Sequence, residues 1–80
     1  MKNSAITEII GWYGVIALLG AYAMVSFGVI AANGVWFQTL NVTGAIGIVI
    51  EASAKKNWQP AVLNIVWAVI GIAVLIKIIL

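Results

Sequence analysis

The sequence predicts an all-α integral membrane protein, a bundle of three transmembrane helices that works as an oligomer. The first observation is composition: 65% of the 80 residues are hydrophobic, 8% are charged, and the mean hydropathy is +1.20. About a quarter of the residues in a globular domain are usually charged. A soluble domain of this length cannot bury so much apolar surface, because small domains leave much of their surface in water. The surplus is expected to face lipid.

The second observation is the spacing of the apolar stretches. A helix of ~20 residues crosses a hydrocarbon core ~30 Å thick, and each stretch is long enough to do so. The connectors are short, so neighbouring helices are expected to run antiparallel. Asn33-Gly34 is a turn signal, and Pro60 suits the first turn of a helix, where its missing N–H costs nothing. Residues 1–80 are predicted to form one transmembrane domain with spans at about 7–30, 34–54 and 60–80.

The third observation is the distribution of lysines, which predicts the orientation. Lys2, the amino terminus, Lys55 and Lys56 lie at one end of the predicted spans, and only Lys77 lies at the other. By the positive-inside rule, the N-terminus and the second connector are cytoplasmic. The first stretch is longer than the apolar region of a signal peptide and carries Glu8 at its start, so we expect it to remain as a span.

Composition also excludes several kinds of function. The chain has no cysteine, no histidine and two carboxylates, so the usual nucleophiles, general bases and metal ligands are missing. We therefore expect neither an enzyme nor a metal or cofactor site. Four scattered lysines form no basic face for nucleic acid.

Small residues are expected to pack the helices together. Lipid provides no hydrophobic drive between helices, so association depends on close packing and on interhelical hydrogen bonds. Spacings of seven residues, or of alternating three and four, predict a left-handed seam like that of a coiled coil. The predicted packing residues are Gly14, Ala21 and Gly28 in the first span, Gly44 in the second, and Ala68 and Gly71 in the third.

Polar residues within the spans are the candidate site. Counting along the helices predicts one polar layer of Glu8, Glu51 and Asn64 and another of Tyr22, Gln38 and Asn41. The amides either tie helices together or line a polar cavity. Trp67 either packs the bundle or stacks on a solute. The candidate substrate-binding residues are Asn64, Asn41, Gln38 and Trp67.

The two carboxylates have simpler interpretations. Glu51 stands four residues before Lys55, the favourable order for an ion pair along a helix. A role in proton coupling is the alternative. Glu8 is expected to complement the helix dipole.

Three motifs follow one another along the chain as Gly11-Trp12, Gln38-x-x-Asn41-x-x-Gly44 and Trp58-x-Pro60-x-x-x-Asn64-x-x-Trp67. In these motifs the chain resembles a group of short bacterial three-span membrane proteins, from about Glu8 to Lys77. The resemblance implies a fold and a place in the bacterial inner membrane, and it assigns no activity.

Gly44 in the second span, and Pro60 followed by Asn64 in the third, are also similar to the semi-SWEET branch of the MtN3 and PQ-loop transporters. Those three-helix units dimerise around a sugar path. The chain departs from them because it has no Pro-Gln pair in its first span, and because Ile46 and Ile48 occupy the place of a mid-helix aromatic residue. The resemblance implies a semi-SWEET-like architecture and transfers only Asn64 as a site residue.

Two functions remain open from the sequence. One is a homodimeric half-transporter for a small polar or uncharged solute, because three helices cannot enclose a path alone. The alternative is an accessory or regulatory subunit that docks onto a larger membrane complex.

Overall fold

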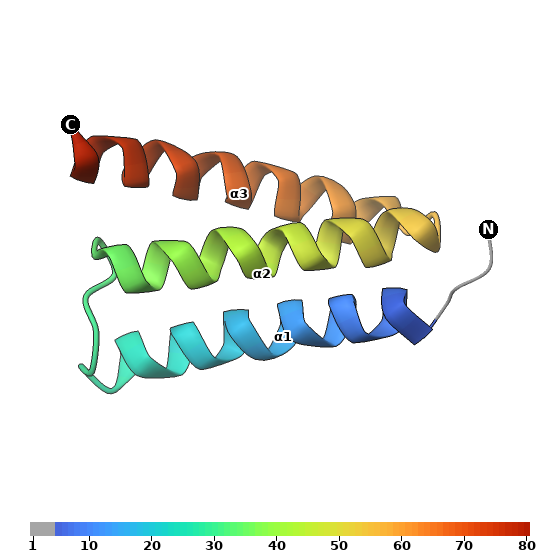
Figure 1. Cartoon of the computed structure of the whole chain (residues 1–80), viewed down its shortest axis with the longest axis horizontal. Coiled ribbons are helices and arrows are strands. Elements are labelled where there is room, and N and C mark those ends of the chain that lie inside the picture. The colour runs from blue at the N-terminus through green and yellow to red at the C-terminus, as the bar shows by residue number, and fades with distance from the viewer. Residues whose placement is uncertain (1–4) are drawn as a thin grey trace.

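A computed structural model describes residues 5–80, so Lys2 and the amino terminus, which contributed to the predicted orientation, lie outside the described residues. This part of the chain forms three helices and no strand: α1 (Ala5–Ser26), α2 (Val35–Ala54) and α3 (Trp58–Ile79), shown in Figure 1. Each helix is long and apolar enough to cross a membrane. The predicted all-α class is confirmed.

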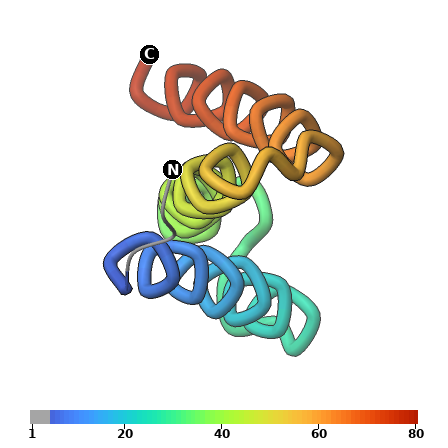
Figure 2. Tube along the Cα trace, turned by 90° about the vertical axis from the view of Figure 1, so that its right-hand side faces the viewer, coloured from blue at the N-terminus to red at the C-terminus, as the bar shows by residue number. Residues whose placement is uncertain are grey.

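The helices lie in an open row with α2 in the middle. α1 and α3 both pack on α2, and no Cα atom of α1 lies within 8 Å of a Cα atom of α3. Figures 1 and 2 show α2 between its two antiparallel neighbours. The physical reason is that α2 alone carries small and polar residues on more than one side. Seven of its residues are buried: Gln38, Asn41, Val42, Gly44, Ala45, Gly47 and Ala52. The expected interior shared by all three helices therefore does not form.

Glycines bring the backbones of α1 and α2 into contact. A Cβ atom on Gly14 would lie 2.5 Å from the carbonyl oxygen of Gly44, and one on Gly47 would lie 2.8 Å from that of Ile10. Ala17 and Ala21 extend the contact and are buried. Such approach is the usual basis of helix association in lipid, and it uses two of the predicted packing glycines, Gly14 and Gly44.

A single stripe of α3 packs on α2. Ala61, Asn64, Ala68 and Gly71 follow one another at spacings of three and four residues, and all four are buried. A Cβ atom on Gly71 would lie 2.6 Å from Cγ2 of Val42. Ala68 and Gly71 therefore pack where the sequence predicted them.

The end of α1 corrects the prediction for Gly28. The helix ends at Ser26, before the predicted boundary at residue 30, and Gly28 follows it with φ +75°. The N–H groups of Gly28 and Val29 donate to the carbonyl oxygens of Val25 and Met24, which is the Schellman arrangement that ends many helices. A Cβ atom on Gly28 would meet nothing within 4 Å. The glycine therefore ends the helix and packs against no other helix.

The end of α2 has the same arrangement with a lysine in place of glycine. Lys56 has φ 57°, and the N–H groups of Lys56 and Asn57 donate to the carbonyl oxygens of Ser53 and Ala52. A left-handed residue at this point reverses the chain within three residues, so α3 begins at Trp58.

Candidate functional site

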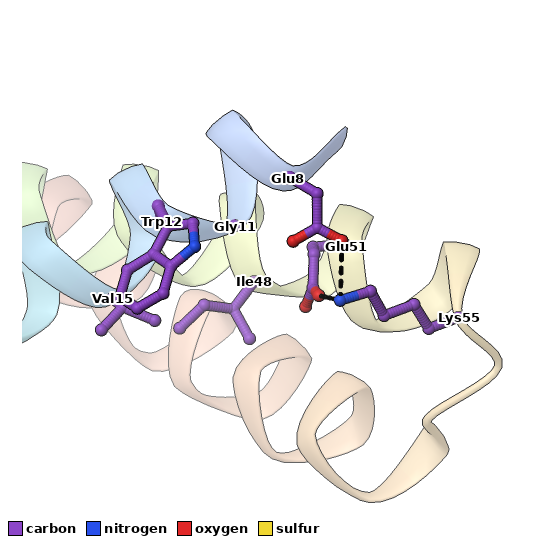
Figure 3. A pocket seen from close by; sticks show the side chains of 7 residues that line it. All are labelled: Glu8, Gly11, Trp12, Val15, Ile48, Glu51 and Lys55. Atoms are coloured by element: carbon purple, nitrogen blue, oxygen red, sulfur yellow. Dashed lines mark ion pairs between the residues drawn. The ribbon is translucent and has the colours of Figure 1, made fainter. Parts of the chain in front are cut away.

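Lys55 joins α1 to the end of α2 through two ion pairs. Its Nζ atom lies 2.9 Å from Oε2 of Glu8 and 2.5 Å from Oε2 of Glu51. Figure 3 marks the two ion pairs with dashed lines. The hydrogen bond with Glu51, followed by that with Glu8, raises the pKa of Lys55 above its ordinary value. The predicted pair of Glu51 with Lys55 is confirmed. Glu8 does more than was expected of it, because it also binds Lys55 across the helix interface.

Gly11 gives the Glu51 side chain its place. A Cβ atom on Gly11 would lie 2.5 Å from Cγ of Glu51. Any larger residue at position 11 would therefore displace the Glu51 side chain. Beside this contact is a pocket of about 240 Å³. Its walls carry the ionic cluster at one end and apolar side chains beyond it (Figure 3). The lining residues are Glu8, Gly11, Trp12, Val15, Ile48, Glu51 and Lys55.

The three predicted amides are all buried, and all belong to the interface of α2 with α3. Gln38, Asn41 and Asn64 are 8%, 4% and 5% exposed. A Cβ atom built on Gly71 would lie 3.2 Å from Oε1 of Gln38 and 3.4 Å from Nδ2 of Asn41. Gln38 and Asn41 therefore meet α3 at one glycine.

The hydrogen bonds of these amides are incomplete. Nε2 of Gln38 donates to the carbonyl oxygen of Ala32, 2.9 Å away in the first connector. Its Oε1 atom is buried without a partner among the described residues, and the Asn41 side chain makes no hydrogen bond within them. An unpaired polar group is costly in an apolar medium. This pair thus offers an acceptor and a donor that the described residues leave unused.

Asn64 is placed differently from either predicted role. Its Nδ2 atom donates to the carbonyl oxygen of Pro60, 2.8 Å away in the same helix. Within residues 5–80 it donates no hydrogen bond to a neighbouring helix, and it does not join Glu8 and Glu51, whose common partner is Lys55. The predicted polar layer of Glu8, Glu51 and Asn64 is therefore wrong for Asn64, while Glu8 and Glu51 do meet, at Lys55.

Trp67 and Tyr22 lie away from the amides. Trp67 is 46% exposed and lines an outer groove of α3 with Leu63, Val66 and Ile70. Tyr22 is 70% exposed, so it does not complete the second predicted layer with Gln38 and Asn41. Neither Tyr22 nor Trp67 belongs to the buried stripe of its helix that packs on α2. Their positions along the helices place both side chains on the outside of the row.

Sequence reasoning missed one polar link between helices. The hydroxyl of Tyr13 on α1 lies 2.7 Å from Oγ1 of Thr43 on α2, and Oγ1 of Thr43 also lies 2.8 Å from the carbonyl oxygen of Thr39. The contact of Gly11 with Glu51 was missed as well.

Comparison with known proteins gives one match. A protein-family model matches residues 7–80. No curated protein and no solved structure matches the chain. The resemblance to semi-SWEET transporters therefore stays a prediction.

Proposed function

Since this chain belongs to the uncharacterised family whose model spans residues 7–80, and membership brings no activity with it, we propose a function from its geometry. We propose that the protein is one half of a homodimeric carrier for a small, polar, uncharged solute. Its place is the bacterial inner membrane, with the N-terminus in the cytoplasm as the lysines predict.

The observation that carries this proposal is the amide pair of Gln38 and Asn41. Oε1 of Gln38 is a buried acceptor without a partner within residues 5–80, and the Asn41 side chain beside it is 4% exposed and makes no hydrogen bond within them. Hydroxyl and amide groups of a neutral solute satisfy both. Ionised side chains within residues 5–80 are confined to helix ends or connectors. The one at this end of the row, Lys77, lines a hollow with Asn33, Val74 and Ile78 that does not include the amides, so we propose an uncharged solute.

The open row of helices supports the dimer. Because α1 and α3 do not meet, one chain encloses no path between them. Two rows that face each other are needed to surround a solute. The amides are buried between α2 and α3 in this arrangement, so the proposal requires α3 to move along or away from α2 at Gly71 when a solute binds.

An accessory subunit is the second candidate, and the same burial favours it. The amides already lie inside one chain, while α1 and α3 present broad apolar faces, with Ile16, Leu19, Val69 and Ile70 more than half exposed. Such faces suit the helices of a larger complex. In this case Gln38 and Asn41 serve stability alone.

Uptake into proteoliposomes distinguishes the two functions. A panel of radiolabelled neutral sugars, polyols and amino acids is tested against the wild type, Gln38→Leu and Asn41→Leu. A carrier moves at least one solute, and each variant loses at least tenfold in uptake while its helix content is retained. Asn41→Leu also keeps its melting temperature, whereas Gln38→Leu loses the hydrogen bond to Ala32. Thr39→Val is the matched control: its side chain is exposed on the same helix, so its uptake stays at the wild-type level.

Native mass spectrometry from lipid nanodiscs supplies the oligomeric state. The carrier requires a defined dimer. A monomer together with absence of uptake across the panel rejects the carrier and favours the accessory subunit. The partner is then sought by cross-linking in the native membrane.

A further inference from the structure

Two adjacent lysines after α2 have different surroundings. Lys55 is held by Glu8 and Glu51, whereas Lys56 has no ion pair within residues 5–80. The ammonium group of Lys56 is exposed. It is therefore available to a negative charge from outside the chain.

Lys56 stands at one end of an apolar groove along the first turns of α3. The groove has a volume of about 760 Å³ and is lined by Lys56, Trp58, Gln59, Val62, Leu63 and Val66. The tryptophan and the three aliphatic side chains are each 53–58% exposed. The polarity of the lining changes in one direction, from a cation through an indole and an amide to aliphatic side chains. A phospholipid has the same order, from phosphate to acyl chain.

The helix that forms the groove also favours an anion at this end. Asn57, the residue before α3, makes no side-chain hydrogen bond to the first turn of the helix. The free N–H groups and the positive end of the helix dipole thus add to the charge of Lys56. Lys56 itself occupies the left-handed conformation that Gly28 occupies after α1. Non-glycine residues in such conformations are often found at functional sites.

We propose that this groove binds an anionic phospholipid, with the phosphate at Lys56 and the first turn of α3 and an acyl chain along Val62, Leu63 and Val66. The lysines predict that this end faces the cytoplasmic leaflet, where anionic lipids attract basic residues. The proposal does not depend on the carrier function, because the groove lies on the outside of α3, apart from the amides.

Fluorescence quenching of Trp58 tests the proposal directly. A chain that keeps Trp58 and carries Trp12→Phe, Trp36→Phe and Trp67→Phe is reconstituted in phosphatidylcholine vesicles. Brominated phosphatidylglycerol or brominated phosphatidylcholine with the same acyl chains is then added, and the relative binding constants are fitted. A lysine near the membrane surface changes lipid affinity by about fivefold, so phosphatidylglycerol is expected to bind about five times more tightly.

Two charge-removing variants provide the comparison. Lys56→Gln should abolish the preference for phosphatidylglycerol. Lys77→Gln, the same change at the opposite end of α3, should leave it intact. Equal quenching by both lipids in the parent chain, or a preference that persists in Lys56→Gln, overturns the proposal. Quenching by neither lipid also overturns it, because the groove is then closed to lipid.

Discussion

At the scale of single residues, the glycines of this chain have different structural roles at different positions. Gly14 touches the backbone of α2, Gly28 ends α1, and Gly20 has nothing within 4 Å of an added Cβ atom. These environments are distinct although all three positions lie in or near the same span. Substitution by alanine should therefore give effects of different sign.

Gly14→Ala is expected to destabilise the protein by about 1–3 kcal/mol, the usual range for an overpacked contact. The added methyl group would meet the carbonyl oxygen of Gly44 at 2.5 Å, and backbone atoms cannot rotate away. Gly20→Ala is the matched control and should be neutral or stabilising, by up to about 1 kcal/mol, because alanine favours the helix. Reversible unfolding in mixed micelles, followed by circular dichroism, measures both. A Gly14→Ala variant as stable as the wild type would show that α1 and α2 are not in backbone contact.

Lys56→Gly is expected to raise stability by about 1 kcal/mol, because a left-handed conformation costs an L-residue about that much and costs glycine little. The same unfolding assay measures it, with Lys56→Ala as the control that keeps the strain and removes the long side chain. If glycine and alanine at this position gave equal stability, the left-handed conformation would not be the cause.

At the scale of helices, the ion pairs of Lys55 connect the start of α1 to the end of α2. All three side chains are partly exposed, and exposed ion pairs contribute little at neutral pH. Their contribution is best detected through the pH dependence of stability.

The raised pKa of Lys55 predicts a loss of stability in alkaline solution. The folded-state pKa lies above the ordinary value of 10.5, so the contribution is complete below pH 10.5 and is lost as the pH rises through the folded-state pKa. Unfolding measured between pH 8 and pH 12 should show this loss in the wild type. Lys55→Gln should show a smaller loss over the same range. If stability fell with pH equally in the wild type and in Lys55→Gln, the ion pairs of Lys55 would not be the cause.

The helices themselves were largely predictable, and the pairing of their side chains was not. Composition and length predict three spans, and Asn33-Gly34 and Pro60 mark two boundaries close to the observed ones. Gly28 was misplaced because a glycine that ends a helix and one that packs can share the same seven-residue spacing. Asn64 bonds to its own helix, and counting residues by depth does not reveal the direction of a side chain.

At the scale of the whole molecule, α2 separates α1 from α3. A closed bundle would bring residues of α1 and α3 together, whereas the row does not. Pairs of introduced cysteines can test this cleanly, because the chain has none of its own.

Tyr13→Cys with Thr43→Cys is expected to cross-link within one chain, because the Tyr13 side chain reaches Thr43 directly across the interface and a short bifunctional reagent spans the gap that the shorter cysteine leaves. Ile16→Cys with Ile70→Cys joins exposed positions of α1 and α3 and should give no cross-link within a chain. Electrophoresis after treatment with a short bifunctional reagent separates cross-linked monomers from dimers. A cross-linked monomer of the second pair would show that α1 and α3 approach each other and that the row is closed.

The central position of α2 also determines how the protein can assemble during synthesis. Its glycine contacts with α1 involve only residues that have been translated before α3 begins, so the first hairpin can form at the insertion machinery while the third helix is still in the ribosome. Because α1 and α3 both pack on α2 and not on each other, α3 can dock later without displacing α1. The chain is two overlapping hairpins that share one helix, and each new span finds its binding surface on the span made just before it.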